Sequence, residues 1–205
     1  MHSVIAVDDD GRPLTRSITW ADTRAAAYAD LILRDLDGHG IYLRTGTPIH
    51  PMSPLVKLLW LRKERGDVFR EAVRFVGIKE YIFYRLFGRW LVDYSIASAT
   101  GLFNLQKLDW DEGALAVAGI TSDHLSKPVP PPHHVEGLAA ATAADLGLPP
   151  GIPFVLGAND GVLSISASMP CAPAMLRSPS APAVPCGRSS IARSPIRKAA
   201  PSATC

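Results

Sequence analysis

The composition of the chain changes near residue 165, and this change limits which part of the chain can build a folded core. Residues 165–205 contain five basic residues, no acidic or aromatic residues, seven of the 18 prolines and all three cysteines. A segment of this kind buries too little apolar surface to offset the entropy lost when its backbone is ordered. We therefore predict a folded body over residues 1–164 and an unstructured tail over residues 165–205.

The positive charge of the tail raises the question of a polyanionic partner. Its basic side chains are dispersed among Ala, Ser and Pro, with no aromatic residue to stack on bases, so we expect no nucleic acid and no membrane partner. The cysteines are 15 and 19 residues apart, which matches no zinc-binding spacing, and we expect no protein-bound metal. The chain lacks both a long apolar run and a signal-peptide pattern, which predicts a cytoplasmic protein.

The body alternates β-prone segments with helical periodicity, which indicates an α/β domain. Residues 3–7 and 16–20, joined by the turn-rich DDDGRP, predict an antiparallel hairpin. A helix is expected from Thr23, with Asp22 or Thr23 as its N-cap, and the glycines at 38 and 40 are expected to end it.

A second helix is expected where Ser53 can cap and Pro54 suits the first helical position. Leu55, Leu58 and Leu59 would form the apolar side of an amphipathic helix. Further along we expect a helix over 79–87, a strand over 90–94, a short helix opening at 110–112, a loop around 126–134 and a helix over 139–146.

Residues 153–157 predict a buried strand that ends in Ala158-Asn159-Asp160-Gly161. Loops at strand ends carry polar groups beyond a rigid scaffold and are frequent ligand sites in α/β folds. Asp22 and Asp160 both follow such strands. Asn-Asp-Gly is also a common turn sequence, so the residues alone leave a plain turn open.

The motif with the most specific spacing is MSPLVKLLWLRKE, from Met52 to Glu64. It is similar to the signature of the FGGY family of carbohydrate kinases, in which a Pro and Lys57 precede Trp60. Further segments resemble this family in the same order, which is more specific than one short pattern: MHSVIAVD, ITWADTRA, VDYSIASATGLFNL, LDWDE and PFVLGANDGVLS. Within the family, these segments taken together are most similar in sequence to gluconate kinases. By spacing alone, Lys57 and Trp60 could equally cover the core from one amphipathic helix.

The resemblance implies a partial ribonuclease-H-like, actin-like N-terminal domain. It also implies ATP-dependent phosphorylation, with Mg²⁺ expected, of gluconate or a related small sugar, with xylulose or another pentulose as the alternative. Asp160 would be the catalytic base that accepts the proton of the attacking hydroxyl. The positions that match the family's substrate contacts are His2, Trp20, Asp22, Arg24 and Asn159. Read without the resemblance, Trp20 could be core, Asp22 a helix cap and Arg24 a solvated charge.

Two family motifs are missing from the sequence: an Asp-x-Gly-Thr-Thr turn at the start and a later Gly-Thr-Ser or Gly-Thr-Gly loop. We therefore expect a chain that begins inside the first domain and has no nucleotide site. Phosphoryl transfer depends on positioning and electrostatic stabilisation, so the chain as translated is expected to be inactive.

The tail has the form of a family sequence read out of frame. The codons GCG GTC ACC ATC GGC ACC AGC GGT, followed by G, encode Ala-Val-Thr-Ile-Gly-Thr-Ser-Gly. Read from the second base they encode Arg-Ser-Pro-Ser-Ala-Pro-Ala-Val, which is residues Arg177–Val184. Every position from 165 to 204 permits a family-like residue under the same shift. Our hypothesis is the loss of one nucleotide, or the gain of two, near codon 164, and resequencing the gene tests it.

Two alternatives from other functional classes stay open at this level. One is a non-catalytic protein that keeps a sugar pocket. The other is a fragment without a ligand or without a stable fold, because strands absent from a partial domain would leave sheet edges and an apolar face uncovered.

Overall fold

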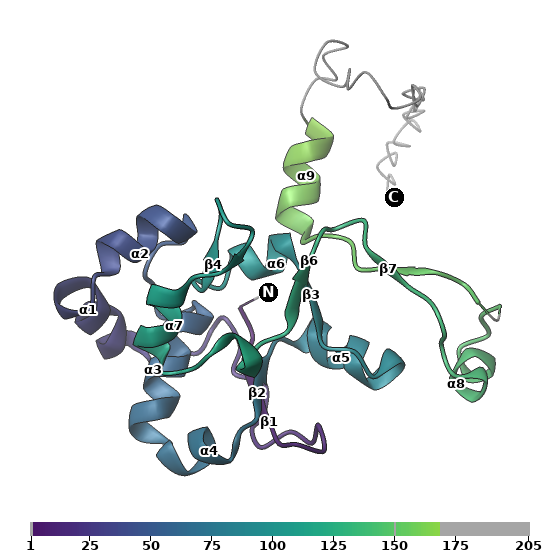
Figure 1. The fold of residues 1–205 in the computed structure, drawn as a ribbon, viewed down its shortest axis with the longest axis horizontal. Helices are drawn as coiled ribbons and strands as arrows, with labels where there is room; N and C mark the ends of the chain where they lie inside the picture. The colour runs from purple at the N-terminus through teal and green to yellow at the C-terminus, as the bar shows by residue number, and fades with distance from the viewer. Residues whose placement is uncertain (1, 150, 169–205) are drawn as a thin grey trace, which may run out of the picture. The chain divides into compact units, whose positions relative to one another are not determined.

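The computed structural model describes residues 2–149 and 151–168, and helix α3 (Pro54–Glu64) lies among α1 (Ala26–Asp35), α4 (Gly66–Glu71) and α7 (Glu112–Ala118) in its main apolar cluster (Figure 1). Every residue from Pro54 to Leu61 is buried. A helix enclosed on all sides has no polar face. The predicted amphipathic helix was therefore right in position and wrong in exposure.

The start of α3 follows the sequence prediction in part. Pro54 occupies the first helical position, and Ser53 before it has an extended backbone. The Ser53 hydroxyl does not cap the helix, however, because it donates to the His50 carbonyl oxygen at 2.9 Å.

The strands pair in twos. The antiparallel pairs are β1 (Ile5–Val7) with β2 (Arg74–Val76), β4 (Phe103–Asn104) with β5 (Asp109–Trp110), and β7 (His134–Val135) with β8 (Phe154–Val155). The parallel pair is β3 (Leu91–Asp93) with β6 (Lys127–Val129), with Val92 opposite Pro128. Figure 1 shows α5 (Ile78–Phe87) on the opposite side of this pair from α3, so helices flank the strands as in the expected α/β domain.

The predicted hairpin at the start is only partly formed. Val4 and Ile18 exchange backbone hydrogen bonds at 3.0 and 2.9 Å, and Val7 bridges Pro13. Residues 16–20 form no continuous strand, because β1 takes β2, about 70 residues later, as its ladder partner.

The first helix departs from its predicted boundaries at both ends. Its N-cap is Ala25, so neither Asp22 nor Thr23 caps it. Gly38 opens a further helix, α2 (Gly38–Thr45), and does not simply end the first one. The chain turns between the two helices at Asp37, whose φ of 56° is left-handed. Asp is one of the few residues that tolerates this conformation.

Two later predictions also need correction. The Pro-rich segment 126–134 was expected to be a loop, yet it contains β6 and part of β7, because a strand edge that needs no N–H donor can accommodate proline. The strand over 153–157 was expected to be buried, yet β8 is short and Val155 is 57% exposed.

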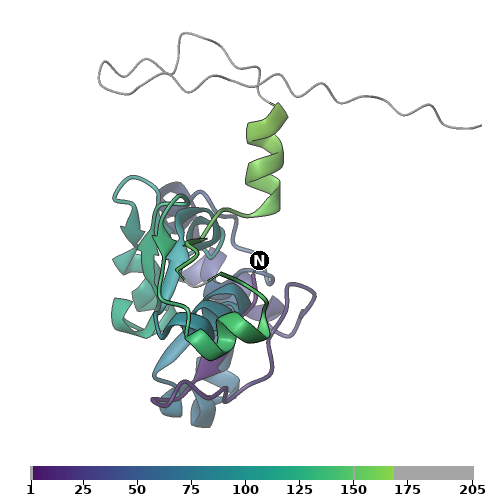
Figure 2. The same cartoon turned by 90° about the vertical axis from the view of Figure 1, so that its right-hand side faces the viewer.

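The helices expected over 79–87 and 139–146 are present within one residue as α5 (Ile78–Phe87) and α8 (Ala140–Asp145), and the helix expected to open at 110–112 is α7. The sequence did not predict α6 (Tyr94–Ser98), η1 (Ser122–His124) or α9 (Asp160–Ser168). In Figures 1 and 2, α9 projects from the other elements, and residues 160–165 are exposed. It runs past the predicted boundary at 164. The rest of the predicted tail, 169–205, lies outside the described residues. No described helix has the length and apolar character that crossing a membrane requires.

Candidate functional site

A buried lysine holds the segments that carry four of the six predicted site residues. Lys57, on α3, is 1% exposed. Its Nζ donates to the carbonyl oxygens of His2 at 2.6 Å and Thr19 at 2.8 Å. Burial lowers the pKa of Lys57 to about 8, against an opposing effect of the Asp22 charge. The ammonium form therefore still predominates at pH 7 and fixes two backbone segments to one helix.

Asp22 and Arg24 form a bidentate ion pair at the end of this segment. Arg24 Nε lies 3.0 Å from both carboxylate oxygens of Asp22, and Nη2 lies 2.6 Å from Oδ2. The guanidinium carbon lies 4.4 Å from the centre of the Trp60 ring, within cation–π range. The hydrogen bond from Arg24 lowers the pKa of Asp22. Trp60 is buried in the main apolar cluster, as the core interpretation expected, and its ring also serves as a platform for Arg24.

Two further residues of this segment differ in exposure. Trp20 is 64% exposed, which makes it a surface ring and not a core residue. The His2 Nδ1 atom is buried, and it has no hydrogen-bond partner among the described residues. Burial and the charges of the amino terminus and Lys57 lower the pKa of His2. A neutral imidazole with one nitrogen unpaired can bond a hydroxyl group.

The other two predicted residues stand where β8 leads into α9. The Asn159 N–H donates to Ser95 Oγ at 2.9 Å, and its Oδ1 accepts the Val162 N–H at 3.0 Å. Asp160 is the first residue of α9 and is exposed. Its Oδ1 accepts the N–H of Gly161 at 2.9 Å. The Asn-Asp-Gly sequence is therefore the start of a helix, and the plain-turn interpretation was incomplete.

Helix α6 connects the two groups of predicted residues. The His2 imidazole lies against the backbone of Ala99, just after α6, and Asn159 bonds Ser95 in its first turn. These two contact points are four residues apart, or about 6 Å along a helix. The structure thus brings His2 and Asn159 to the two ends of one short helix.

Three polar residues that support this arrangement were not predicted: Lys57 as a backbone clamp, and Asp93 and Ser95 as an anchor for Asn159. The available signals were a single charge inside the apolar run PLVKLLWL and the Asp-x-Ser pattern of a helix N-cap. Neither pattern predicts which distant segment the Lys57 or Ser95 side chain contacts.

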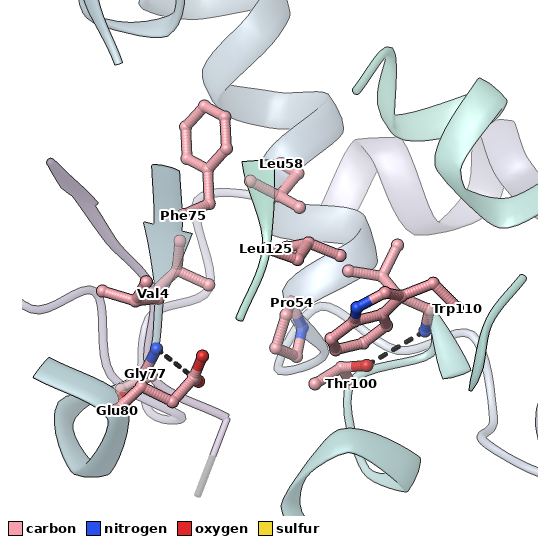
Figure 3. Close-up of a pocket in the computed structure, with 12 residues that line it drawn as sticks. Val4, Pro54, Leu58, Phe75, Gly77, Glu80, Thr100, Trp110 and Leu125 are labelled. Atoms are coloured by element: carbon pink, nitrogen blue, oxygen red, sulfur yellow. Dashed lines mark hydrogen bonds between the residues drawn. The ribbon is translucent and has the colours of Figure 1, made fainter. Parts of the chain in front are cut away.

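A cavity of about 30 Å³ lies beside the His2 segment and is lined by Ser3, Gly77 and Glu80 among mostly apolar residues. Figure 3 shows the Glu80 carboxyl at its edge, where Oε1 accepts the Gly77 N–H at 2.7 Å. Burial raises the pKa of Glu80 to about 7, and the charge of Asp93 adds to the rise. This volume suits a water molecule and is far below that of a sugar site. A wider hollow of about 650 Å³ lies between residues 10–13 and α5. The six predicted residues line neither.

The described residues do not offer a metal site next to Asp160. Among them, the one group of three carboxylates close enough to share an ion is Asp8, Asp9 and Asp10. This group lies in the turn after β1, where Arg12 pairs with Asp10 at 3.0 Å and Tyr84 of α5 donates to the Asp10 carbonyl. It contacts none of the six predicted site residues, and these carboxylates do not fit the Mg²⁺ expected from the resemblance.

The fold is that of the N-terminal domain of a carbohydrate kinase. The crystal structure of gluconate kinase from Lactobacillus acidophilus superposes with a TM-score of 0.77 at 38% identity, over 80% of this chain and 33% of that chain. A ligand-bound xylulose kinase from the same organism gives the same TM-score and identity, over 80% and 34%.

The chain belongs to the FGGY family of carbohydrate kinases, because the model of that family's N-terminal domain matches residues 1–166. It is 54% identical over 164 residues to the gluconokinase of Bacillus subtilis, which covers 80% of this chain and 32% of that protein. The chain therefore spans about a third of the length of this relative. The family assignment made from the sequence motifs is confirmed.

Proposed function

We propose that this chain carries the sugar-binding part of an ATP-dependent kinase that phosphorylates gluconate or a closely related sugar. The observation that carries the proposal is that His2 and Asn159 contact the two ends of α6, in a chain 54% identical to a gluconokinase. A polyhydroxylated substrate needs several hydrogen-bonding groups placed by a rigid scaffold.

The first group of residues would bind and orient the substrate. The exposed Trp20 ring suits the apolar face of a carbon chain. The His2 Nδ1 atom is buried and unpaired, so it would bond a substrate hydroxyl only after a local movement exposes it. Arg24 uses Nε and Nη2 for Asp22, which leaves its Nη1 donors for a substrate carboxylate. A gluconate carboxylate would satisfy those donors, whereas a pentulose has no such group.

Asp160 would be the catalytic base. In the proposed step, the substrate hydroxyl oxygen forms a bond to the γ-phosphorus of ATP as the bond from that phosphorus to the β–γ bridging oxygen breaks. The hydroxyl proton passes to the Asp160 carboxylate, and ADP leaves with the bridging oxygen. The exposed position of Asp160 at the start of α9 leaves its second oxygen, Oδ2, accessible to a substrate.

ATP belongs to the proposal on family grounds, as the phosphoryl donor. Mg²⁺ is expected on the same grounds, but the described residues supply no carboxylate cluster for it beside Asp160. No step is therefore assigned to the metal. For the same reasons we expect the 205-residue chain to bind the sugar without transferring phosphate.

Two experiments test this function. Calorimetry of the 205-residue chain with gluconate and with xylulose should give binding of one or both without ATP. A protein with the downstream reading frame restored should then release ADP when given ATP and gluconate. Xylulose is the second candidate, because a xylulose kinase structure matches this fold as well as a gluconate kinase does. Absence of sugar binding together with absence of ADP release would overturn the proposal.

A further inference from the structure

One hydroxyl group joins α6 to the segment that carries Asp160. Ser95 Oγ accepts the Asn159 N–H at 2.9 Å, and the Ser95 carbonyl oxygen accepts from Asn159 Nδ2 at 3.4 Å. On the other side of this segment, the last backbone hydrogen bond to the β7 strand region comes from Gly157, whose N–H donates to the Pro131 carbonyl oxygen at 2.9 Å. Among the described residues, the hydrogen bonds that tie 158–160 to another segment therefore come from Ser95.

The direction of this hydroxyl is set by Asp93, which is completely buried. A serine hydroxyl has one hydrogen to donate, and an ionised carboxylate can only accept. The Ser95 hydroxyl donates to Asp93 Oδ1, and its lone pairs are left to accept the Asn159 N–H. The bond to Asn159 thus depends on the carboxylate behind it.

Asp93 is itself fixed on two sides. Its Oδ1 accepts the N–H groups of Ser95 and Ile96, both at 3.1 Å, and so caps α6. Its Oδ2 accepts from Lys79 Nζ of α5 at 2.5 Å. Because α5 and α6 both hold this carboxylate, Ser95 Oγ presents a fixed acceptor at the surface that Asn159 meets.

The position of the Asp160 carboxylate follows from that acceptor. Asn159 Oδ1 accepts the Val162 N–H, and Asp160 Oδ1 accepts the Gly161 N–H, so the first turn of α9 begins from an anchored Asn159. We propose that Ser95, oriented by Asp93, is a positioning residue for Asp160. The inference rests on the proposed function in one respect, the assignment of Asp160 as the base.

Hydrogen exchange of the 205-residue chain, followed by NMR, tests the inference. Ser95→Ala removes the hydroxyl and keeps the backbone cap on Asp93. We expect the Asn159, Gly161 and Val162 amides to exchange about tenfold faster, which corresponds to the loss of one hydrogen bond of ordinary net strength. The α3 amides should be unchanged, which shows that the variant is folded.

Two variants act as controls. Ser95→Thr keeps a hydroxyl at this position and should restore the slow exchange. Ser98→Ala removes a hydroxyl from the same helix that bonds only the Ser95 carbonyl, at 3.0 Å, and should leave residues 159–162 unchanged. Unchanged exchange at 159–162 in Ser95→Ala, or equal acceleration in Ser98→Ala, would overturn the positioning role.

Gluconate calorimetry on the same variants separates this inference from the proposed function. If the wild-type chain binds gluconate, Ser95→Ala should weaken binding several-fold through Asn159, and Ser95→Thr should restore it. If the wild-type chain binds no sugar while the exchange pattern holds, the proposed function fails and the positioning of Asp160 by Ser95 stands. If Ser95→Ala binds gluconate as tightly as the wild-type chain does, the hydrogen bond from Asn159 to Ser95 does not contribute to substrate binding.

Discussion

The two groups of candidate site residues rest on unequal supports. The His2–Arg24 segment is fixed to α3, which lies inside the largest apolar cluster of the described residues. The Asn159–Asp160 segment follows a two-stranded sheet whose apolar cluster contains only Val129, Val135 and Leu156 as buried members. Its other support is the polar anchor at Ser95. Packing of the apolar core therefore fixes the position of the His2–Arg24 segment, whereas a few hydrogen bonds fix the position of the Asn159–Asp160 segment.

The largest expected effect is on the free energy of unfolding, when a buried leucine in each of the two apolar clusters is replaced by alanine. Leu58, in the large cluster, is 1% exposed, and Leu58→Ala should lower the free energy of unfolding by about 2–5 kcal/mol. Leu156→Ala should cost less than half as much, because a small cluster at the surface can collapse around the cavity. Urea unfolding measures both. Equal losses would show that the two supports are equally well packed.

Glu80, a buried carboxyl residue of α5, should make the stability of the chain depend on pH. Its carboxyl edges the cavity beside Ser3, and burial, with a smaller contribution from the charge of Asp93, raises its pKa to about 7. The folded state thus holds this proton more tightly than the unfolded chain, whose carboxyl has its ordinary pKa of 4.5. This contribution is complete below pH 4.5 and is lost as pH rises through 7, by roughly 3 kcal/mol.

The matched variant for this effect is Glu80→Gln, which keeps an acceptor for the Gly77 N–H but cannot ionise. Urea midpoints measured from pH 4.5 to pH 8 should fall more steeply for the wild-type chain than for this variant. Parallel pH profiles for the two proteins would contradict the raised pKa of Glu80.

A smaller effect is expected when the clamp on the substrate side is removed. Lys57→Met leaves the carbonyl oxygens of His2 and Thr19 without their donor, and the free energy of unfolding should fall by about 2 kcal/mol. Gluconate affinity should fall at least tenfold, because both segments are then released. Lys63→Met changes an exposed lysine of the same helix and should alter neither quantity. If Lys57→Met behaves like that control, the clamp does not support the site.

The smallest effect is expected at the exposed ion pair. Arg24→Lys loses the bidentate contact with Asp22 and much of the contact with Trp60, and unfolding should become easier by only about 0.5–1 kcal/mol. Urea unfolding in low and high salt measures this. Arg12→Lys, in the more exposed pair with Asp10, is the matched comparison, and a larger loss there would contradict the role of the Trp60 platform.

Much of the chain was predictable from local patterns. Pro54 marks the first residue of α3, the periodicity of residues 79–87 gives α5, and Asp111 caps α7 through the Ala114 N–H at 3.0 Å. Signals of this kind act over three or four residues, and the chain contains them in full. The order of the family motifs also identified the family, whose N-terminal domain model matches residues 1–166.

The sequence by itself thus determined the family, the positions of most helices and the placement of Asp160 after a strand. Only the tertiary structure decided that residues 54–61 of α3 are all buried, that the Pro-rich segment pairs as β6, and which residues hold the site together. Lys57 reaches Thr19 and His2 across 38 and 55 residues, and Ser95 reaches Asn159 across 64. The partner of a polar side chain over such separations depends on how the apolar core folds the chain, and local spacing does not encode it.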